Sequence, residues 1–255
     1  MTFAESLGVQ AREMVSLIGA GGKTTTLFRL AKELREKGGK VLVTTTTKIF
    51  KPAKPHVERL FLVQDVNAFI KESKNIARPA VIGAGHGVDD DGQLLGLPAP
   101  WLDDIEKSAE FDAILVEADG AASRFFKVPS EMEPVIPKLS RLVIWLMAIK
   151  VLGKPLDANS VHRAERAIAL LGVALGTRLT PEHIVHLLAH REGCLKGIPE
   201  SSRKVALINQ ADSPEEIAAA QKLARALLPL GFERAVITSF LTDEGFKDVI
   251  QIKTH

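Results

Sequence analysis

The chain has 255 residues, of which 46% are hydrophobic and 25% charged, as is typical of a soluble globular protein that buries a substantial core. Its formal net charge is only +2, tyrosine is missing, and aromatic residues make up 5%, which argues against nucleic acid or a membrane as the main partner. A single cysteine excludes an internal disulfide, and the first residues lack the pattern of a signal peptide, so we expect a cytoplasmic protein.

Short apolar runs alternate with amphipathic stretches along the chain. We expect strands at 14–18, 40–44, 60–63, 80–83, 113–116, 142–146, 205–208 and 235–238. We expect helices at 23–37, 66–75, 101–109, 159–171, 181–191 and 214–228. Strands rich in Val, Ile and Leu that alternate with helices form parallel sheets covered on both faces. The pattern predicts one α/β domain over residues 1–255, in which the helical block at about 158–198 is an insertion or a small lid.

The first expected strand runs into a glycine-rich turn and then into a helix, which is the context of a P-loop. Glycines let backbone N–H groups approach phosphate oxygens, and the helix N-terminus adds a positive partial charge. We expect Lys23 to reach the β- and γ-phosphates of a nucleotide and the Thr24 hydroxyl to ligate Mg²⁺. The candidate nucleotide-binding residues of this segment are Gly19, Gly21, Gly22, Lys23, Thr24 and Thr25.

The P-loop pattern is a compact one. The longer pattern G-x-x-x-x-G-K-[ST] would require glycine at position 17, which is Leu17 here. The loop resembles that of Mur-type peptide ligases and folylpolyglutamate synthetases more than that of small GTPases. The alternative is a glycine-rich turn with an incidental lysine. It does not explain why the strand, the glycines, the Lys-Thr pair and the helix follow one another in the order of a P-loop. The fold class is therefore expected to be a three-layer, P-loop NTPase-like fold with a mostly parallel sheet and helices on both faces.

Two acids follow the apolar run at 113–116. Glu117 and Asp119 are two residues apart and so lie on one side of the strand end, which is the arrangement of a Walker B element that holds Mg²⁺. We expect one of them to bind the metal and the other to orient a water molecule or another nucleophile. With Lys23 they are the candidate catalytic residues, and with Thr24 the candidate metal ligands. A solvated turn is the alternative.

Polar residues also follow two other expected strands. The run Thr44–Lys48 closes the second strand, where Thr46 and Lys48 are candidates for contact with the nucleotide, although threonine also simply favours strands. Asn209 and Asp212 follow the strand at 205–208 and are similar to the element by which many GTPases read guanine. An N-cap at Asp212 or Ser213, before Pro214, explains this segment equally well. His162-Arg163 opens a helix, where Arg163 would contact an anion or form a structural salt bridge.

Taken in order, these motifs resemble the YqeC family, whose members are described as accessory proteins of selenium-dependent molybdenum hydroxylases. The resemblance covers almost the whole chain and rests on Ile18–Thr26, Val41–Ile49, Val116–Ala121, Lys127–Pro129, Glu133–Pro137, Leu152–Leu156, Val161–Arg163, Lys196–Pro199 and Asn209–Asp212. It implies a P-loop protein acting on or around a molybdopterin-type cofactor. It also implies site roles at Gly21, Gly22, Lys23, Thr24, Glu117, Asp119, Lys127, Glu133, His162 and Arg163. One departure is that Ala148-Ile149-Lys150 stands where the family tends to have Gly-x-Asp.

Three functions fit the sequence. The first is an NTP-hydrolysing accessory factor in selenium or molybdenum-cofactor enzyme maturation, which uses ATP or GTP with Mg²⁺. The second is an ATP-dependent transferase or ligase acting on a small molecule, and the third is a nucleotide-sensing module without turnover. In each case the expected partner is a nucleotide, with a molybdenum hydroxylase or its pterin cofactor as a further one, and neither nucleic acid nor membrane is expected to bind.

Overall fold

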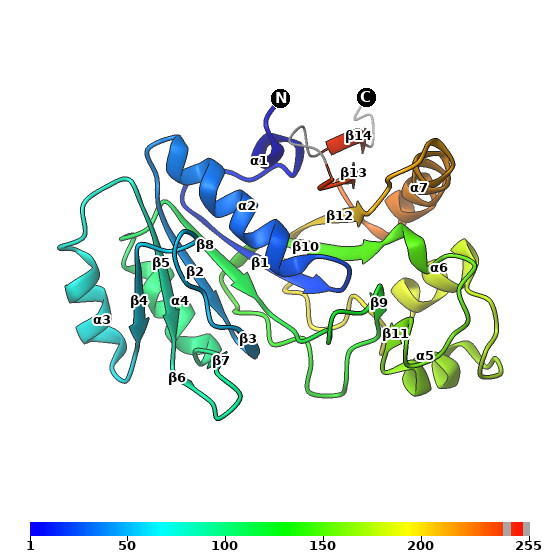
Figure 1. The fold of residues 1–255 in the computed structure, drawn as a ribbon, viewed down its shortest axis with the longest axis horizontal. Coiled ribbons are helices and arrows are strands. Elements are labelled where there is room, and N and C mark those ends of the chain that lie inside the picture. Colours follow the sequence, from blue (N-terminus) through cyan, green and yellow to red (C-terminus); the bar gives the residue numbers. More distant parts are fainter. Residues whose placement is uncertain (242–245, 252–255) are drawn as a thin grey trace.

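A mixed, mostly parallel sheet forms the centre of the molecule (Figure 1). The computed structural model describes residues 1–241 and 246–251, and within them this sheet has nine strands in the order β14-β13-β12-β10-β1-β8-β2-β5-β4. Only the pair β13–β14 is antiparallel in it. The bounds are β1 Glu13–Gly19, β2 Lys40–Thr45, β4 Arg59–Leu62, β5 Ala80–Gly85, β8 Ala113–Glu117, β10 Ser140–Ala148, β12 Arg203–Asn209, β13 Arg234–Thr238 and β14 Phe246–Gln251.

Helices cover both faces of this sheet, as the apolar pattern predicts. Val15 and Leu17 of β1 pack with Leu27 and Leu30 of α2 (Lys23–Glu36), and α1 (Phe3–Ser6) joins the same core. Met14 and other alternate residues of the strands point to the opposite core, which α3 (Val66–Ser73), α4 (Ala99–Lys107) and α7 (Pro214–Leu227) complete. The successive side chains of β1 thus enter different cores, which is the period of two expected of a strand buried on both faces. The α/β three-layer fold is confirmed.

The long connection from β10 to β12 carries the helical block expected at 158–198. It contains the 3₁₀ turn η1 (Ile149–Val151), strand β11 (Val161–His162), and helices α5 (Ala164–Leu171) and α6 (Pro181–Ala189), which lie at the lower right of Figure 1. The expectation of a helix from residue 159 is wrong at its start. Val161 and His162 pair instead with β9 (Phe126–Lys127), and α5 begins only after Arg163. A strand of two residues has no periodicity from which it could be predicted.

Other short elements also escape the sequence pattern. Strands β3 (Lys48–Phe50), β6 (Gly87–Val88) and β7 (Gln93–Leu95) form a small antiparallel sheet. The 3₁₀ turn η2 (Leu228–Leu230) follows the end of α7.

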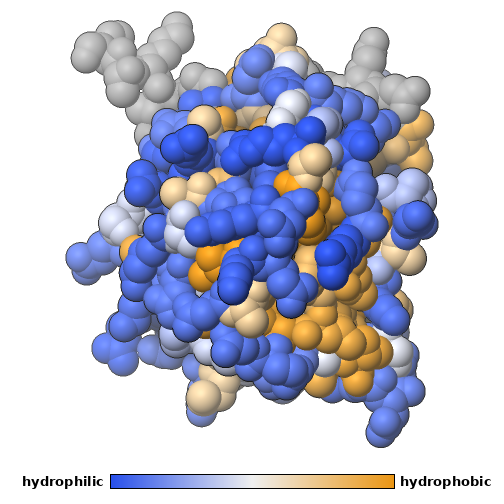
Figure 2. Space-filling model, turned by 90° about the vertical axis from the view of Figure 1, so that its left-hand side faces the viewer, coloured by the Kyte–Doolittle hydropathy of each residue, from blue (hydrophilic) through white to orange (hydrophobic). Residues whose placement is uncertain are grey.

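The edge strand β4 and helix α3 lie at the left of Figure 1. Figure 2 views the molecule from this end and shows a hydrophobic area within a mostly hydrophilic surface. No helix within 1–241 or 246–251 is long and apolar enough to cross a membrane.

The strand order places the sequence motifs at one edge of the sheet. β1 lies between β8 and β10, and β8 lies between β1 and β2. In this register Leu17 of β1 and Thr45 of β2 both pair with Glu117 of β8. Because the carboxyl ends of parallel strands meet at one edge, the glycine-rich turn, the two acids and the threonine run come together there.

Candidate functional site

The turn between β1 and α2 requires glycine at three positions, of which Gly19 and Gly22 show the reason best. Gly19 has φ 94°, and a Cβ there would lie 2.2 Å from the Leu146 carbonyl oxygen of β10. Gly22 has φ 128°, and a Cβ there would lie 2.5 Å from Nδ2 of Asn209. L-residues with a side chain rarely adopt such φ values, and both contacts are far below van der Waals distance. The turn therefore passes closer to its neighbours than any other residue would allow.

The N–H groups of this turn face two different ways. Those of Ala20 and Gly21 donate to the carbonyl oxygens of Leu146 (3.0 Å) and Arg124 (3.1 Å), which differs from the expectation that successive N–H groups of the turn face phosphate. Gly22 is the N-cap of α2 and has no side chain to satisfy the first turn. The N–H groups that a bound anion can use are therefore those at the start of α2, where the helix itself offers no acceptor.

Lys23 is buried at the start of α2. Its Nζ donates to the Gly19 carbonyl oxygen at 2.7 Å and lies 3.0 Å from Oδ1 of Asp119 and 3.5 Å from Oε1 of Glu117. Burial acts to lower the pKa of Lys23, but the charges of Asp119 and Glu117 outweigh it, so that its pKa is raised. Lys23 therefore stays a cation beside the helix N-terminus, which concentrates positive potential there.

Thr24 and Glu117 form the pair that fits a metal ion. The Thr24 hydroxyl donates to Oε2 of Glu117 at 2.9 Å, and both residues line the same pocket. Burial raises the pKa of Glu117, against the opposing effects of Lys23 and Thr24. A hydroxyl and a carboxylate are hard oxygen ligands, as Mg²⁺ prefers. Within the described ranges no group of three or more His, Cys, Asp or Glu side chains is placed to hold a metal, so phosphate and water would complete its coordination.

Asp119 lies behind this pair rather than in the pocket. It is 2% exposed and does not line the pocket. Its Oδ2 accepts from the Gly19 N–H at 2.9 Å and lies 3.5 Å from Nζ of Lys127, while its Oδ1 faces Lys23. Asp119 thus ties the glycine-rich turn to two buried lysines. The geometry favours a role in positioning Lys23 over direct contact with a metal.

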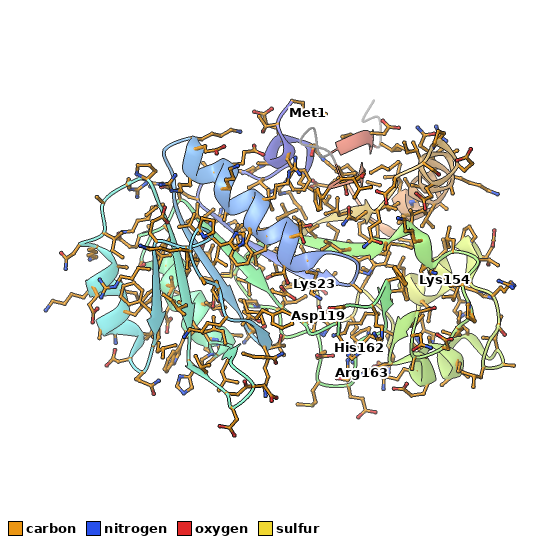
Figure 3. All side chains as sticks on the ribbon, viewed as in Figure 1. Met1, Lys23, Asp119, Lys154, His162 and Arg163 are labelled. Atoms are coloured by element: carbon orange, nitrogen blue, oxygen red, sulfur yellow. The ribbon has the colours of Figure 1, made fainter. Side chains whose placement is uncertain are left out.

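The charges continue from Asp119 to the far end of the pocket. Lys127 of β9 lies 2.9 Å from Oε2 of Glu133, and Nη1 of Arg163 lies 2.6 Å from the same oxygen. Burial lowers the pKa of Lys127. Burial and then the charges of Lys127 and Arg163 lower the pKa of His162, which pairs in register with Lys127. Negative and positive side chains therefore alternate along a chain of ion pairs, which joins Glu117, Lys23, Asp119, Lys127, Glu133 and Arg163. Figure 3 shows Lys23, Asp119, His162 and Arg163 one after another in this order.

The remaining candidates lie around the pocket in different ways. Lys48 lines the pocket and pairs with Asp89 at 2.9 Å. Thr46 does not line the pocket, because its hydroxyl donates to the Val135 carbonyl oxygen, and the neighbouring Thr47 lines it instead. Asn209 is buried and holds the turn through a 2.8 Å bond from Nδ2 to the Gly21 carbonyl oxygen.

In the segment similar to a guanine-reading element, Gln210 lines the pocket but Asp212 lies outside it. Asp212 pairs with Lys150 and accepts from Ser239. Ser213, not Asp212, is the N-cap of α7, where it forms a capping box with Glu216. The pocket lining does not include Asp212. The N-cap explanation of this segment therefore has direct structural support at Ser213.

The pocket has a volume of about 700 Å³, within the range of small-molecule sites. Thr25 and the loop Gly120–Phe125 also line it. Outside the glycines, the described residues with positive φ are Arg12, Ala109, Ala122, Ser123, Arg163 and Gln210, and the last four line this pocket. Such backbone strain concentrates at functional sites. Sequence patterns missed Ala122, Ser123 and Gln210 because nothing in a single sequence marks a non-glycine residue that adopts positive φ, and they missed Arg124 because it belongs to no motif.

Comparison with known proteins gives a family that agrees with this arrangement. The family model described as YqeC protein matches residues 15–165, which is more than half of the chain. The chain belongs to the YqeC family. An uncharacterized protein YqeC of Escherichia coli (strain K12) is 32% identical over 222 residues, covering 87% of this chain and 85% of the relative. The family match includes the glycine-rich turn, Glu117, Asp119, Lys127, Glu133, His162 and Arg163.

Proposed function

We propose that this YqeC protein binds a nucleoside triphosphate with Mg²⁺ at the start of α2 and hydrolyses it. The observation that carries the proposal is the convergence of Lys23, Thr24 and Glu117 at one end of a 700 Å³ pocket. There a helix N-terminus and a buried ammonium face a hydroxyl–carboxylate pair. Phosphate oxygens suit the first two groups, and a hard divalent cation suits the pair.

Each group has a defined part in this function. The first-turn N–H groups of α2 and Lys23 bind the β- and γ-phosphates and stabilise the charge that develops on them. Thr24 and Glu117 hold Mg²⁺, which supplies charge neutralisation between the phosphates. Asp119 and Asn209 keep the turn in place through Gly19 N–H and the Gly21 carbonyl. The resulting activity is nucleotide turnover in a site whose backbone is held in strained conformations.

Binding is tested by the thermal stability of the protein with ATP, GTP or CTP, each with and without Mg²⁺. A ligand at about 100 times its Kd stabilises the folded state by about 2.7 kcal/mol. We expect such stabilisation to require Mg²⁺ in the wild type and to be lost in Thr24→Val, which keeps a β-branched side chain but removes the hydroxyl. Lys32→Ala, on the exposed side of the same helix, is the matched control. If no nucleotide stabilises the wild type, the proposal is wrong.

Turnover is tested by phosphate release under the same conditions. We expect release in the wild type and loss in Glu117→Gln, which keeps the shape of the side chain without its charge. Tight nucleotide binding without release under any condition would instead favour a nucleotide-sensing module.

The biological setting of this activity follows from the family resemblance. We propose that turnover is coupled to the maturation of a selenium-dependent molybdenum hydroxylase. The expected result is nucleotide hydrolysis stimulated by the cofactor-free hydroxylase and lost in Lys23→Ala. Full maturation of the hydroxylase in cells that carry Lys23→Ala would contradict this part of the proposal alone.

A further inference from the structure

The end of the pocket opposite Lys23 has polar groups that nucleotide binding at α2 does not use. His162 and Arg163 come from the β10–β12 connection, Arg124 comes from the loop after β8, and Glu133 lies between them. All four line the pocket. Glu133 and Arg163 are the last two members of the chain of charges that begins at Glu117, and Lys127 connects them to Asp119.

Positive charge at this end exceeds what the nearby carboxylate neutralises. Oε2 of Glu133 accepts from both Lys127 and Arg163, so one oxygen serves two cations. Arg163 uses Nη1 for this contact, and within residues 1–241 and 246–251 its Nη2 and Nε make no hydrogen bond. Arg124 uses Nε to bind the Ala158 carbonyl oxygen at 2.7 Å. Two guanidinium groups are thus available to an anion, and guanidinium is the side-chain group best matched to carboxylate and phosphate.

His162 adds a polar group of a different kind. It is half-buried and lines the pocket, and within the part of the chain that the structure describes its imidazole makes no hydrogen bond. Pairing between β11 and β9 fixes its position beside Lys127. The imidazole nitrogens can therefore hydrogen-bond a molecule that enters the pocket.

The backbone of this end has positive φ at residues other than glycine. Arg163 adopts the left-handed region with φ 61° and ψ 55°, immediately before α5. Ala122 and Ser123, in the loop that carries Arg124, have φ 44° and 56°. Strain of this kind persists where the surrounding structure fixes it, and it clusters at ligand sites.

We propose that this end is a subsite for a small anionic co-substrate, a carboxylate or a phosphate ester, bound while the nucleotide occupies the start of α2. Arg163 and Arg124 pair with the anionic group, and His162 hydrogen-bonds the same molecule. This inference rests on the proposed nucleotide site for its two-ligand form, and it adds to the proposed nucleotide turnover the chemical class of a second ligand, a small anion.

The test is an NMR titration of the histidine ring signals with inorganic phosphate. The His162 signal is assigned with His162→Asn, and the protein is saturated with Mg²⁺ and a non-hydrolysable ATP analogue. We expect a saturable shift of the His162 signal in the wild type and a loss of phosphate affinity of about tenfold or more in Arg163→Asn. Asparagine is chosen because it tolerates the left-handed conformation. Arg124→Gln is expected to weaken binding too, and Arg178→Gln, in the same β10–β12 connection but bonded to the Gly153 carbonyl, is the control.

The outcomes separate this inference from the proposed function. If the analogue does not bind, the proposed function fails, and the titration is repeated without it in Lys23→Met. A His162 shift that persists there and is lost in Arg163→Asn still supports the anion subsite. A shift that is lost in Lys23→Met and kept in Arg163→Asn places phosphate at α2 and overturns the subsite. No saturable shift in the loaded wild type means that the nucleotide fills both ends, which also overturns it.

Discussion

Nζ of Lys23, at the start of α2, and Oδ1 of Asp119, just after β8, lie 3.0 Å apart, with 3% of each side chain exposed. The same carboxylate accepts from the Gly19 N–H and faces Lys127. This one contact therefore links the glycine-rich turn, the start of α2 and strand β9. Four predictions follow from the arrangement around it.

Removing the Lys23 ammonium is expected to destabilise the fold as well as nucleotide binding. Lys23→Met leaves Asp119 and Glu117 buried beside an uncharged group, and breaking a buried pair costs about 3–5 kcal/mol. Urea unfolding measures this, and the double variant with Asp119→Asn is expected to lose less than the sum of the single losses. Lys32→Ala, whose side chain is 77% exposed, is expected to change stability by about 0.5 kcal/mol or less. Additive effects of the Lys23 and Asp119 variants would refute the coupling.

The two kinds of constraint on Gly22 can be separated with a matched glycine. Gly38→Ala introduces a side chain at φ 92° with nothing within 4 Å, so only backbone strain is added, at a cost of about 1 kcal/mol. Gly22→Ala adds strain and also drives Cβ against Asn209. We expect Gly22→Ala to lower the free energy of unfolding by clearly more than Gly38→Ala and to weaken nucleotide binding. Equal losses in chemical denaturation would show that the contact with Asn209 relaxes freely.

Substitution of Asn209 and Asp212 is expected to affect all nucleotides alike. Asn209→Ala removes the bond to the Gly21 carbonyl and leaves the Thr238 hydroxyl without its acceptor, at a cost of about 1–3 kcal/mol. Asp212→Asn is expected to leave the ratio of ATP to GTP affinity unchanged, because Asp212 contacts Lys150 and Ser239 outside the pocket. A loss of GTP affinity alone, measured by calorimetry, would instead show that Asp212 reads the base.

His162 is expected to make stability depend on pH. Its pKa in the folded protein lies below the ordinary value of about 6.5, mainly because of burial and then the charges of Lys127 and Arg163. Between the two pKa values the unfolded chain binds more protons than the folded one, so stability falls as the pH drops through about 6.5 towards the folded pKa. Unfolding experiments across this window are expected to show a smaller slope in His162→Asn. An identical slope would assign the dependence to other groups.

The sequence predicts those parts of the protein that depend on long, regular signals. The strand at 113–116 is an apolar run followed by two acids, and the turn at Gly19–Thr26 follows another apolar run. Because the two strands are parallel neighbours, their carboxyl ends lie side by side. Glu117 therefore meets Thr24 and Lys23 as expected. Spacing alone could not show that Asp119 turns behind the pocket, because that depends on Lys127, which arrives from a two-residue strand.

Other features could not be predicted, because they depend on contacts between residues that are far apart in the sequence and belong to no local motif. Lys150 pairs with Asp212, which is 62 residues further along the chain, so the two positions are explained only together. Likewise, Arg163 precedes a helix in the sequence, but it adopts the left-handed conformation directly after β11, which pairs with the distant strand β9. Neither relationship produces a repeating pattern of hydrophobic and polar residues from which a single sequence could predict it.

The division of the pocket between two parts of the chain has a consequence for divergence within the family. The phosphate end is built from the sheet edge, where a change at Gly19, Gly22 or Asp119 disturbs the core, whereas His162 and Arg163 belong to the β10–β12 connection, between two strands that pair directly. Insertions or deletions in this connection can therefore leave the glycine-rich turn and its sheet edge unchanged. The two ends of the pocket can diverge at separate rates among relatives.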